Sequence, residues 1–305
     1  MTTQTMAATP ASTNGKDDEI QRLMARQEYA WPTIGLFVII VLAATSATIA
    51  ALTGAISIWW GFAINTICSY IAYSVLHEAS HGLVSTHRRL NDFVGRIALF
   101  MVSVTPFFRT YRFLHMTHHR FTNDPIKDPD YFAGHGSAWT LPIRWMVMDT
   151  AYVTTYFRPG FYSDRPRGEK IDFWLSIAFG IALIAVVVAM GWVVPFLLLY
   201  FIPTRIALFV LAITFDYLPH YPYSETAQSN KFRATNNRVG MEWLITPLLL
   251  GHNYHLSHHL NPTVPFYRYV KLWNASKHLY ADKHPATVDY NRLRPRAVPT
   301  ANESD

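Results

Sequence analysis

The stretch Ser57–His81, SIWWGFAINTICSYIAYSVLHEASH, joins a long apolar run directly to a pair of histidines. Residues 57–76 carry no charged side chain, and as a helix they are long enough to cross the hydrocarbon core of a bilayer. His77 and His81 follow at once, and side chains four residues apart share one face of a helix. Because imidazole is the commonest metal ligand near neutral pH, this stretch predicts a transmembrane helix that ends in a metal site at the membrane edge.

Three other apolar runs are long enough to span a membrane. Trp31–Leu52 precedes the first stretch and is separated from it by a short turn around Gly54, while Phe173–Met190 and Val193–Phe215 are separated by a turn at Gly191. Half of the residues are hydrophobic but 15% are charged, a mixture that suits a membrane anchor with a large polar cap. We therefore expect an all-α integral membrane protein, with four transmembrane helices in two hairpins and a cytoplasmic helical cap that carries the metal site.

The distribution of basic residues predicts the orientation. Of the 26 Lys and Arg residues, 25 lie in the N-terminal tail, in 84–170 or after residue 216, and the two turns within the hairpins carry none. The positive-inside rule then places both termini and both large loops in the cytoplasm, and we expect the inner (plasma) membrane. The exception is Arg205, inside the fourth run. An intramembrane arginine is a functional candidate, but pairing with a carboxylate or snorkelling is the simpler interpretation.

These observations divide the chain into five parts. They are a cytoplasmic N-terminal tail (1–30), the first hairpin with the first histidine pair (31–83), a cytoplasmic cap with the second histidine box (84–170), the second hairpin (171–215) and a second cytoplasmic cap with the third box and the C-terminal tail (216–305). Within the N-terminal tail, residues 1–19 are expected to be disordered. Three apolar segments are too short or too interrupted to span and are expected to be helices in the membrane interface: Phe93–Phe108, Ala138–Phe157 and Met241–Leu250. The single Cys68 excludes an intrachain disulfide, and nothing suggests a nucleic-acid partner.

Two further histidine boxes follow the pattern H-x-x-H-H. They read His115-Met-Thr-His118-His119 and His255-Leu-Ser-His258-His259, and His252 precedes the second of them by three residues. Residues at i, i+3 and i+4 share a helix face, whereas adjacent histidines diverge by about 100° and could serve different ions. Three boxes supply more ligands than one ion can use, which predicts a polynuclear site. The isolated histidines are expected at the surface: His87, His135, His278 and His284.

The order of the three boxes across four apolar runs resembles the membrane-bound fatty acid desaturase and hydroxylase superfamily, from about Trp31 to Tyr269. The words Thr122-Asn-Asp-Pro125 and Asn253-Tyr-His255 are similar to those of bacterial acyl-lipid desaturases and of the related carotenoid hydroxylases and ketolases. The resemblance implies a non-haem di-iron centre with all-histidine protein ligation, and O₂ as co-substrate. Iron suits such chemistry because it is redox-active, whereas zinc is not.

Motif matching carries the implied ligand set over to this sequence. The ligands would be His77, His81, His115, His118, His119, His255, His258 and His259, with His220 in the place of a histidine that the family uses at the end of the fourth span. Ligand imidazoles need an acceptor on their other nitrogen, and the candidates for that role or for an extra ligand are Glu78, Asp124, Asp128, Asp130 and Asp216. A simple Asx–Pro turn explains Asp124–Asp130 equally well. His252 lies outside the common pattern and could be a further ligand or a neighbour of one.

The resemblance implies O₂-dependent oxidation of an aliphatic lipid, with a fatty acyl chain as the first substrate and a carotenoid ring as the alternative. The same centre could desaturate, hydroxylate, or release CO₂ from a fatty acid to leave a terminal alkene. The sequence contains no haem or flavin motif, so electrons are expected from a separate ferredoxin, or a cytochrome with its reductase. Basic residues of the cap suit an acidic carrier or, equally, the membrane surface: Arg88, Arg89, Arg165, Arg167 and Lys170.

A zinc hydrolase is the alternative from another class. His77-Glu78-Ala-Ser-His81 matches H-E-x-x-H, in which two histidines bind zinc and the glutamate is the general base of a protease. That interpretation leaves the two H-x-x-H-H boxes unexplained, because catalytic zinc needs three protein ligands. A metal carrier or sensor is a non-enzymatic alternative, but transport sites lie near the membrane midplane and these histidines follow the apolar runs.

Overall fold

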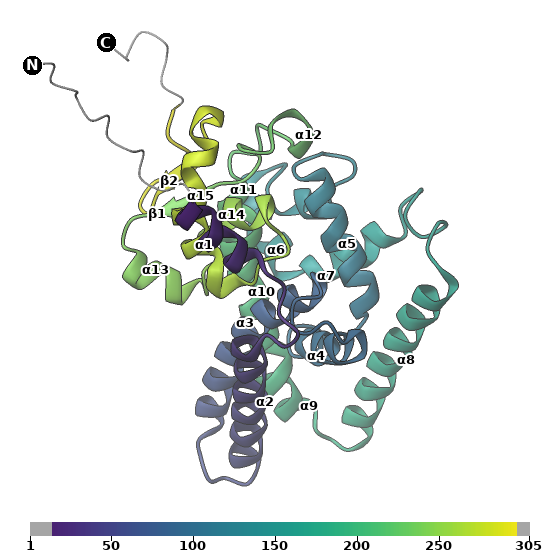
Figure 1. Ribbon diagram of the computed structural model, residues 1–305. Helices are drawn as coiled ribbons and strands as arrows, with labels where there is room; N and C mark the ends of the chain where they lie inside the picture. Colours follow the sequence, from purple (N-terminus) through teal and green to yellow (C-terminus); the bar gives the residue numbers. More distant parts are fainter. Residues whose placement is uncertain (1–13, 298–305) are drawn as a thin grey trace, which may run out of the picture.

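The computed structural model describes residues 14–297, which are mostly helical. Three helical segments are long and apolar enough to cross a membrane: α2 (Trp31–Leu52), α8 (Arg167–Ala189) and the continuous segment Val193–His220. The helices α2, α3 (Ile58–Ser80) and α8 and the short α9 (Val193–Phe196) project to one side of the molecule, and most of the shorter helices gather on the other (Figure 1). Along α2 and α8 many large apolar side chains are exposed, as expected for surfaces that face lipid.

The remaining expected span, residues 57–76, forms helix α3 (Ile58–Ser80), which is not among these three apolar segments. It is the central helix and packs against α2, α4 (Arg88–Phe100) and α10 (Ile202–Leu211). Its polar side chains bond to these neighbours: Asn65 Nδ2 donates to Thr48 Oγ1 at 2.9 Å and to the Leu199 carbonyl at 2.6 Å, and Ser69 Oγ donates to the Met101 carbonyl at 2.6 Å. Such hydrogen bonds join helices within a membrane bundle, but the residues that make them lower the hydropathy of α3.

Close helix packing around α3 also depends on Gly61. A Cβ atom there would lie 2.8 Å from Leu199 Cδ2 and 2.9 Å from Ala51 Cβ. Only glycine therefore lets α3 approach α2 and the segment Val193–His220 this closely, as small residues do at membrane helix interfaces.

Two π-helical turns interrupt the segment Val193–His220. In order it comprises α9 (Val193–Phe196), a π-helical turn (Leu197–Phe201), α10, a second π-helical turn (Ala212–Tyr217) and α11 (Leu218–His220). π-helical turns are wider than α-helical ones and occur often at functional sites. The second one contains Asp216 and ends just before His220, so it sets the direction in which both side chains leave the helix.

Arg205, the basic residue inside the fourth run, forms an ion pair. Its Nη1 and Nη2 donate to the two carboxylate oxygens of Asp149 at 2.9 and 2.8 Å, and Ser103 Oγ donates to the same carboxylate at 3.0 Å. The pair ties α10 to α7 (Met148–Tyr156), and the expectation of a carboxylate partner for Arg205 is confirmed.

The cap consists of shorter helices. They are α5 (Phe108–Phe121), α6 (Leu141–Met146), α7 (Met148–Tyr156), α12 (Ala227–Asn230), α13 (Glu242–Leu248), α14 (His255–Leu260) and α15 (Tyr269–Ser276), with short 3₁₀ turns at Pro129–Ala133, Ala138–Thr140, Phe266–Arg268 and Lys277–Lys283. The expectation of one helix over Phe93–Phe108 is wrong: α4 ends at Phe100, and the chain turns before Pro106 and enters α5. Residues 138–157 likewise form a 3₁₀ turn and two helices, because Val147 has non-helical dihedral angles.

Two further expectations need correction. Residues 14–19, expected to be disordered, belong to helix α1 (Asn14–Met24), whereas the rest of that stretch lies outside the described residues. Ile20 and Leu23 of α1 pack on the core around Tyr269, and Arg268 Nη1 donates to the Leu23 carbonyl at 2.9 Å, so tertiary contacts hold this helix. The chain is also not entirely α-helical, because β1 (Asn237–Val239) and β2 (Thr287–Asp289) form a small parallel sheet.

Candidate metal centre

Nine histidines converge where α3, α5, α11 and α14 meet. They form two groups, and within each group one ring nitrogen from every residue lies within 4.8 Å of the others. The first group is His77, His81, His115, His119 and His258, and the second is His118, His220, His255 and His259. The structure thus brings together every histidine for which the sequence predicted a metal-binding role, apart from the unassigned His252.

Helix geometry explains how the boxes are shared between the groups. His118 and His119 are neighbours on α5, and they diverge around the helix axis so that each joins a different group. His258 and His259 on α14 separate in the same way. Each H-x-x-H-H box therefore contributes to both groups.

The ring nitrogens in the two groups face one another at short distances. Nε2 of His81 lies 2.9 Å from Nε2 of His115, and Nε2 of His119 lies 3.0 Å from Nε2 of His258. In the second group, Nε2 of His255 lies 3.1 Å from Nε2 of His220 and 3.0 Å from Nε2 of His259. A single proton can form a hydrogen bond between two of these nitrogens, but it cannot bind several nitrogens that converge on one point. A metal cation can, because it accepts the lone pairs of all of them.

Buried nitrogens without any hydrogen-bond partner support the same conclusion. Both ring nitrogens of His77 are buried and unpartnered, as are Nδ1 of His115 and Nδ1 of His255. Burying a polar group without a partner is costly, so these groups need a further ligand. The donor set, four or five imidazoles for each group, fits transition-metal ions such as iron.

The histidines of the first group are held neutral. Burial lowers the pKa of His81 to about 3, and it lowers the pKa of His115, His119 and His258 well below the usual value. Nearby histidines act in the same direction. A neutral imidazole keeps a lone pair on one nitrogen, which is the form that binds metals.

The pKa of His118 shifts in the opposite direction, because two carboxylates lie close to its Nδ1. Its Nδ1 donates to Asp128 Oδ1 at 2.8 Å and lies 3.4 Å from Asp130 Oδ2. Burial alone would lower the pKa of His118, but the negative charges of Asp128 and Asp130 outweigh it and raise that pKa to about 9. With its Nδ1–H bonded to Asp128, His118 presents Nε2 to the second group. Both aspartates were candidates for such a role from the sequence.

Three neutral side chains fix other imidazoles. Asn123 Oδ1, which can only accept, lies 3.2 Å from His220 Nδ1, so Nδ1 carries the proton and Nε2 carries the lone pair that faces His255. Tyr269 Oη lies 2.8 Å from His258 Nδ1, and Thr122 Oγ1 lies 3.3 Å from His259 Nδ1. None of the three was a candidate site residue from the sequence. Thr122 and Asn123 lie within four residues of the end of the second box at His119, but no spacing rule singles out Tyr269.

The remaining acidic candidates do not contact an imidazole nitrogen. Glu78 is fully buried and accepts a hydrogen bond from the Phe266 backbone N–H at 3.1 Å, which ties α3 to the C-terminal part of the cap. Asp124 accepts from the backbone N–H groups of Ile126 and Lys127, both at 2.9 Å, as the turn interpretation predicts. Asp216 lines a cavity beside the histidines.

His252 lies against the first group but is not part of it. Its ring meets the ring of His77 edge to face, with centroids 4.7 Å apart, and stacks near Phe266. Both of its ring nitrogens are buried without a partner.

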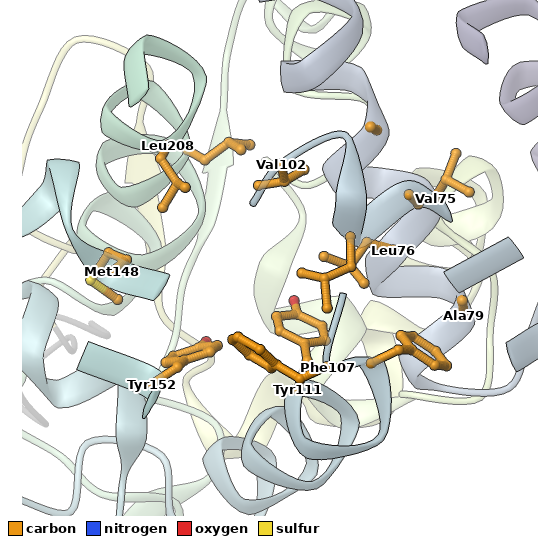
Figure 2. Packing of buried hydrophobic residues seen from close by; sticks show 14 of the residues in the cluster. Val75, Leu76, Ala79, Val102, Phe107, Tyr111, Met148, Tyr152 and Leu208 are labelled. Atoms are coloured by element: carbon orange, nitrogen blue, oxygen red, sulfur yellow. The ribbon is translucent and has the colours of Figure 1, made fainter. Parts of the chain in front are cut away.

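A narrow cavity of about 50 Å³ adjoins the centre. Figure 2 shows side chains that surround it, among them Leu76, Met148 and Leu208. Tyr111 lines this cavity, and its ring lies parallel to the His115 ring with centroids 5.8 Å apart, so this tyrosine lies between the cavity and the first group. The lining is mostly apolar, and its polar members are Tyr73, Ser103, Tyr111, Asp149, Tyr152 and Asp216.

Apolar helices, a histidine-rich centre and an adjoining apolar cavity define a membrane metalloprotein. The sequence matches the fatty acid desaturase family over residues 54–291, most of the chain, and the chain belongs to that family. It is therefore a membrane oxidoreductase of the desaturase type, and its two histidine groups are consistent with a di-iron site. A zinc protease site does not fit, because His77 and His81 gather with three more histidines and Glu78 points to a backbone amide.

Relatives with known activities fall into two kinds. The chain is 28% identical to the dihydrorhizobitoxine desaturase of Bradyrhizobium elkanii, and the match covers 68% of this chain and 66%, just under two thirds, of that protein. It is 25% identical to a beta-carotene ketolase of a Paracoccus species over 78% of this chain and 86% of the ketolase. A shorter match, 34% identical, covers 27% of this chain and 18% of the omega-3 fatty acid desaturase fat-1 of Caenorhabditis elegans.

Proposed function

We propose that this protein uses O₂ to oxidise the hydrocarbon part of a lipid at a centre of two iron ions. The observation that carries the proposal is the pair of histidine groups, five and four residues, beside an apolar cavity in a membrane protein. One ion would be held by His77, His81, His115, His119 and His258, and the other by His118, His220, His255 and His259. Iron supplies the redox chemistry with O₂ that an unactivated C–H bond requires, and zinc lacks it.

The cavity residues would position the carbon that reacts. Leu76, Met148 and Leu208 offer apolar contacts to a hydrocarbon chain and keep water away from it. Tyr111 lies between this chain and the His115 ring, so its position sets how closely a methylene approaches the centre. Small changes in that approach would decide between desaturation, hydroxylation and loss of CO₂ from a fatty acid.

A fatty acyl chain is the proposed substrate, because the cavity beside the histidines is lined mostly by apolar side chains. A carotenoid ring is the second candidate, since carotenoid ketolases stand among the relatives.

The neighbouring side chains would keep the imidazoles in their binding form. Asp128 accepts the Nδ1 proton of His118, and Asn123 accepts that of His220, so both present Nε2 to the second ion. In the first group, the hydrogen bond between Tyr269 Oη and His258 Nδ1 would likewise leave Nε2 of His258 free to bind its ion. Such neighbours typically strengthen metal binding ten- to a hundredfold.

The topology and the partners are part of the proposal. With α3 as a fourth span between α2 and α10, the parts 1–30, 84–170 and 216–305 would lie in the cytoplasm and the hairpins 31–83 and 171–215 in the inner membrane. The excess of Lys and Arg in the cytoplasmic parts supports this orientation. Electrons would come from a separate ferredoxin or cytochrome.

The experiment is a product analysis of the purified protein. It would be supplied with a reduced ferredoxin, O₂ and either dodecanoic acid or beta-carotene, and products would be identified by mass spectrometry. We expect an oxidised fatty acid or a terminal alkene, and less of it from Leu208→Trp, which fills the cavity. Oxidised carotenoid alone would favour the second candidate, and no product from either would contradict the proposal.

A further inference from the structure

The face of α5 that points away from the histidines forms the floor of a groove. The groove measures about 800 Å³ and runs between α5 and the loop Arg158–Phe161 that follows α7. Its apolar members include Phe113, Met116, Phe121, Ile126 and Phe161, and its charged members are Arg120, Lys127 and Arg158. Within residues 14–297, no acidic side chain lines it.

Only the thickness of α5 separates this groove from the metal centre. His115, His118 and His119 leave one face of the helix, whereas Met116, Thr117 and Arg120 leave the other. Met116 is 41% exposed, and His115 beside it is 3% exposed. Because a helix with its side chains is about 10 Å across, a molecule in the groove would be roughly 10 Å from the ring nitrogens.

The positive charge of the groove is not neutralised within the described residues. Arg120, Lys127 and Arg158 have no carboxylate within 4.0 Å there. The Arg120 guanidinium and the Lys127 ammonium instead lie over the Phe121 ring, 5.1 and 4.9 Å from its centroid. These contacts keep both cations beside the apolar floor.

Two of the basic residues expected to serve a carrier are already paired. Arg165 binds the Glu169 carboxylate at 2.8 and 2.9 Å, and Arg88 lies 3.9 Å from Asp92. Pairing reduces the field that such residues present to a partner. The groove on α5 is therefore a better electrostatic match for an acidic molecule than Arg88 or Arg165.

The position of the groove favours a protein over a lipid. α5 runs from the level of α4, beside the apolar helices, towards α12 on the opposite side of the molecule (Figure 1). The end of the groove near α12 carries Ile126, which is 75% exposed, and Lys127. An apolar floor with a charged rim is the pattern of protein interfaces, and small, weakly bound interfaces are usual for electron carriers.

We propose that an acidic one-electron carrier protein docks in this groove and delivers electrons across α5 to the metal centre. This inference rests on the proposed function. For desaturation, reduction of O₂ to two water molecules takes four electrons and four protons. The substrate supplies two of each as its C–C bond becomes C=C, so the carrier supplies two electrons, one at a time, and solvent supplies two protons.

The test uses the full chain in detergent and an acidic [2Fe–2S] ferredoxin as the probe. The variant R120E/K127E/R158E reverses three charges of the groove, and the control is K271E/K277E, which changes the exposed Lys271 of α15 and the exposed Lys277 just after that helix. Binding of ferredoxin to the immobilised protein and the KM for ferredoxin are measured at low and at moderate salt. We expect the groove variant to weaken binding and raise KM at least tenfold at low salt, with metal content unchanged, and the control to change either less than twofold.

Three outcomes would overturn the docking site. They are no measurable binding of ferredoxin to the wild type, equal effects of the groove and control variants, and an effect that depends on anionic lipid in nanodiscs but not on ferredoxin. Single-turnover product formation after chemical reduction separates this inference from the proposed function. Equal product from the wild type and the groove variant would support the proposed oxidase, and any loss with ferredoxin would then be due to docking alone. No product from the wild type would contradict the proposed oxidase itself.

Discussion

Replacing Asp128 by Asn should weaken metal binding in the second histidine group. Asp128 accepts the Nδ1 proton of His118 at 2.8 Å and also the backbone N–H groups of Asn123 and Asp130 at 2.6 and 2.9 Å. Asparagine has nearly the same shape and keeps one acceptor oxygen. The substitution therefore removes the negative charge behind His118 with little change in packing.

The expected loss follows from the buried position of the pair. Removing a carboxylate behind a ligand histidine typically costs ten- to a hundredfold in metal affinity, or about 1.4–2.7 kcal/mol. Asp130 lies 3.4 Å from the same nitrogen and retains part of the field, so we expect about tenfold, the lower end of that range.

The metal-free protein gives a second, pH-dependent readout. The folded-state pKa of His118, about 9, is above the unfolded value of about 6.5, so its protonated form stabilises the fold fully below pH 6.5 and loses this effect as the pH rises towards 9. The Asp128 variant should lose up to about 3 kcal/mol at pH 6 and much less at pH 9.

Metal affinity would be measured by competition with a chromogenic chelator, and stability by chemical denaturation in detergent. Asp124→Asn is the matched control, because Asp124 bonds two backbone amides of a turn and no imidazole. Equal metal affinity in the Asp128 variant and the wild type, or an equal loss in the control, would refute the assigned role of Asp128.

Three further predictions concern other buried groups. His252→Phe should leave the metal content unchanged, because His252 lies outside both histidine groups; loss of an ion would show that it is a ligand. Asp149→Asn should lower the free energy of unfolding by up to about 3 kcal/mol, since it leaves Arg205 without its partly buried partner, and Asp149→Leu/Arg205→Leu should recover much of that in thermal unfolding. Burial lowers the pKa of His81 and His252 to about 3, so below pH 6.5 these two histidines are protonated in the unfolded chain but stay neutral in the folded chain. Metal-free protein should therefore lose about 3 kcal/mol of stability per pH unit from these two residues between pH 6 and 4, which urea titrations would detect.

Much of the centre could be predicted from spacing because helical periodicity determines which neighbours share a face. The separation of His118 from His119 between two groups follows from the angle between adjacent residues. Asn123 and Tyr269, by contrast, reach their histidines through the path of loops, which no local pattern encodes. Asp124, Asp128 and Asp130 were all candidates because of their carboxylates. Residue type could not show that Asp128 bonds to His118 whereas Asp124 bonds to backbone amides of a turn.

The elements that the sequence analysis missed depend on tertiary contacts. Apolar runs predicted α2 and α8 well, since lipid-facing helices need no specific partner. Helix α1 forms because Ile20 and Leu23 pack on a core made by the opposite end of the chain. β1 and β2 pair although they are far apart in the sequence, and the π-helical turns before His220 depart from the period on which helix prediction relies.

The metal content of the purified protein, compared with that of His118→Ala and His258→Ala, shows whether the centre holds two irons. His118 belongs to one histidine group and His258 to the other, so we expect two irons in the wild type and the loss of a different ion in each variant. A single zinc that both variants retain, and that His77→Ala loses, would contradict a di-iron oxidase.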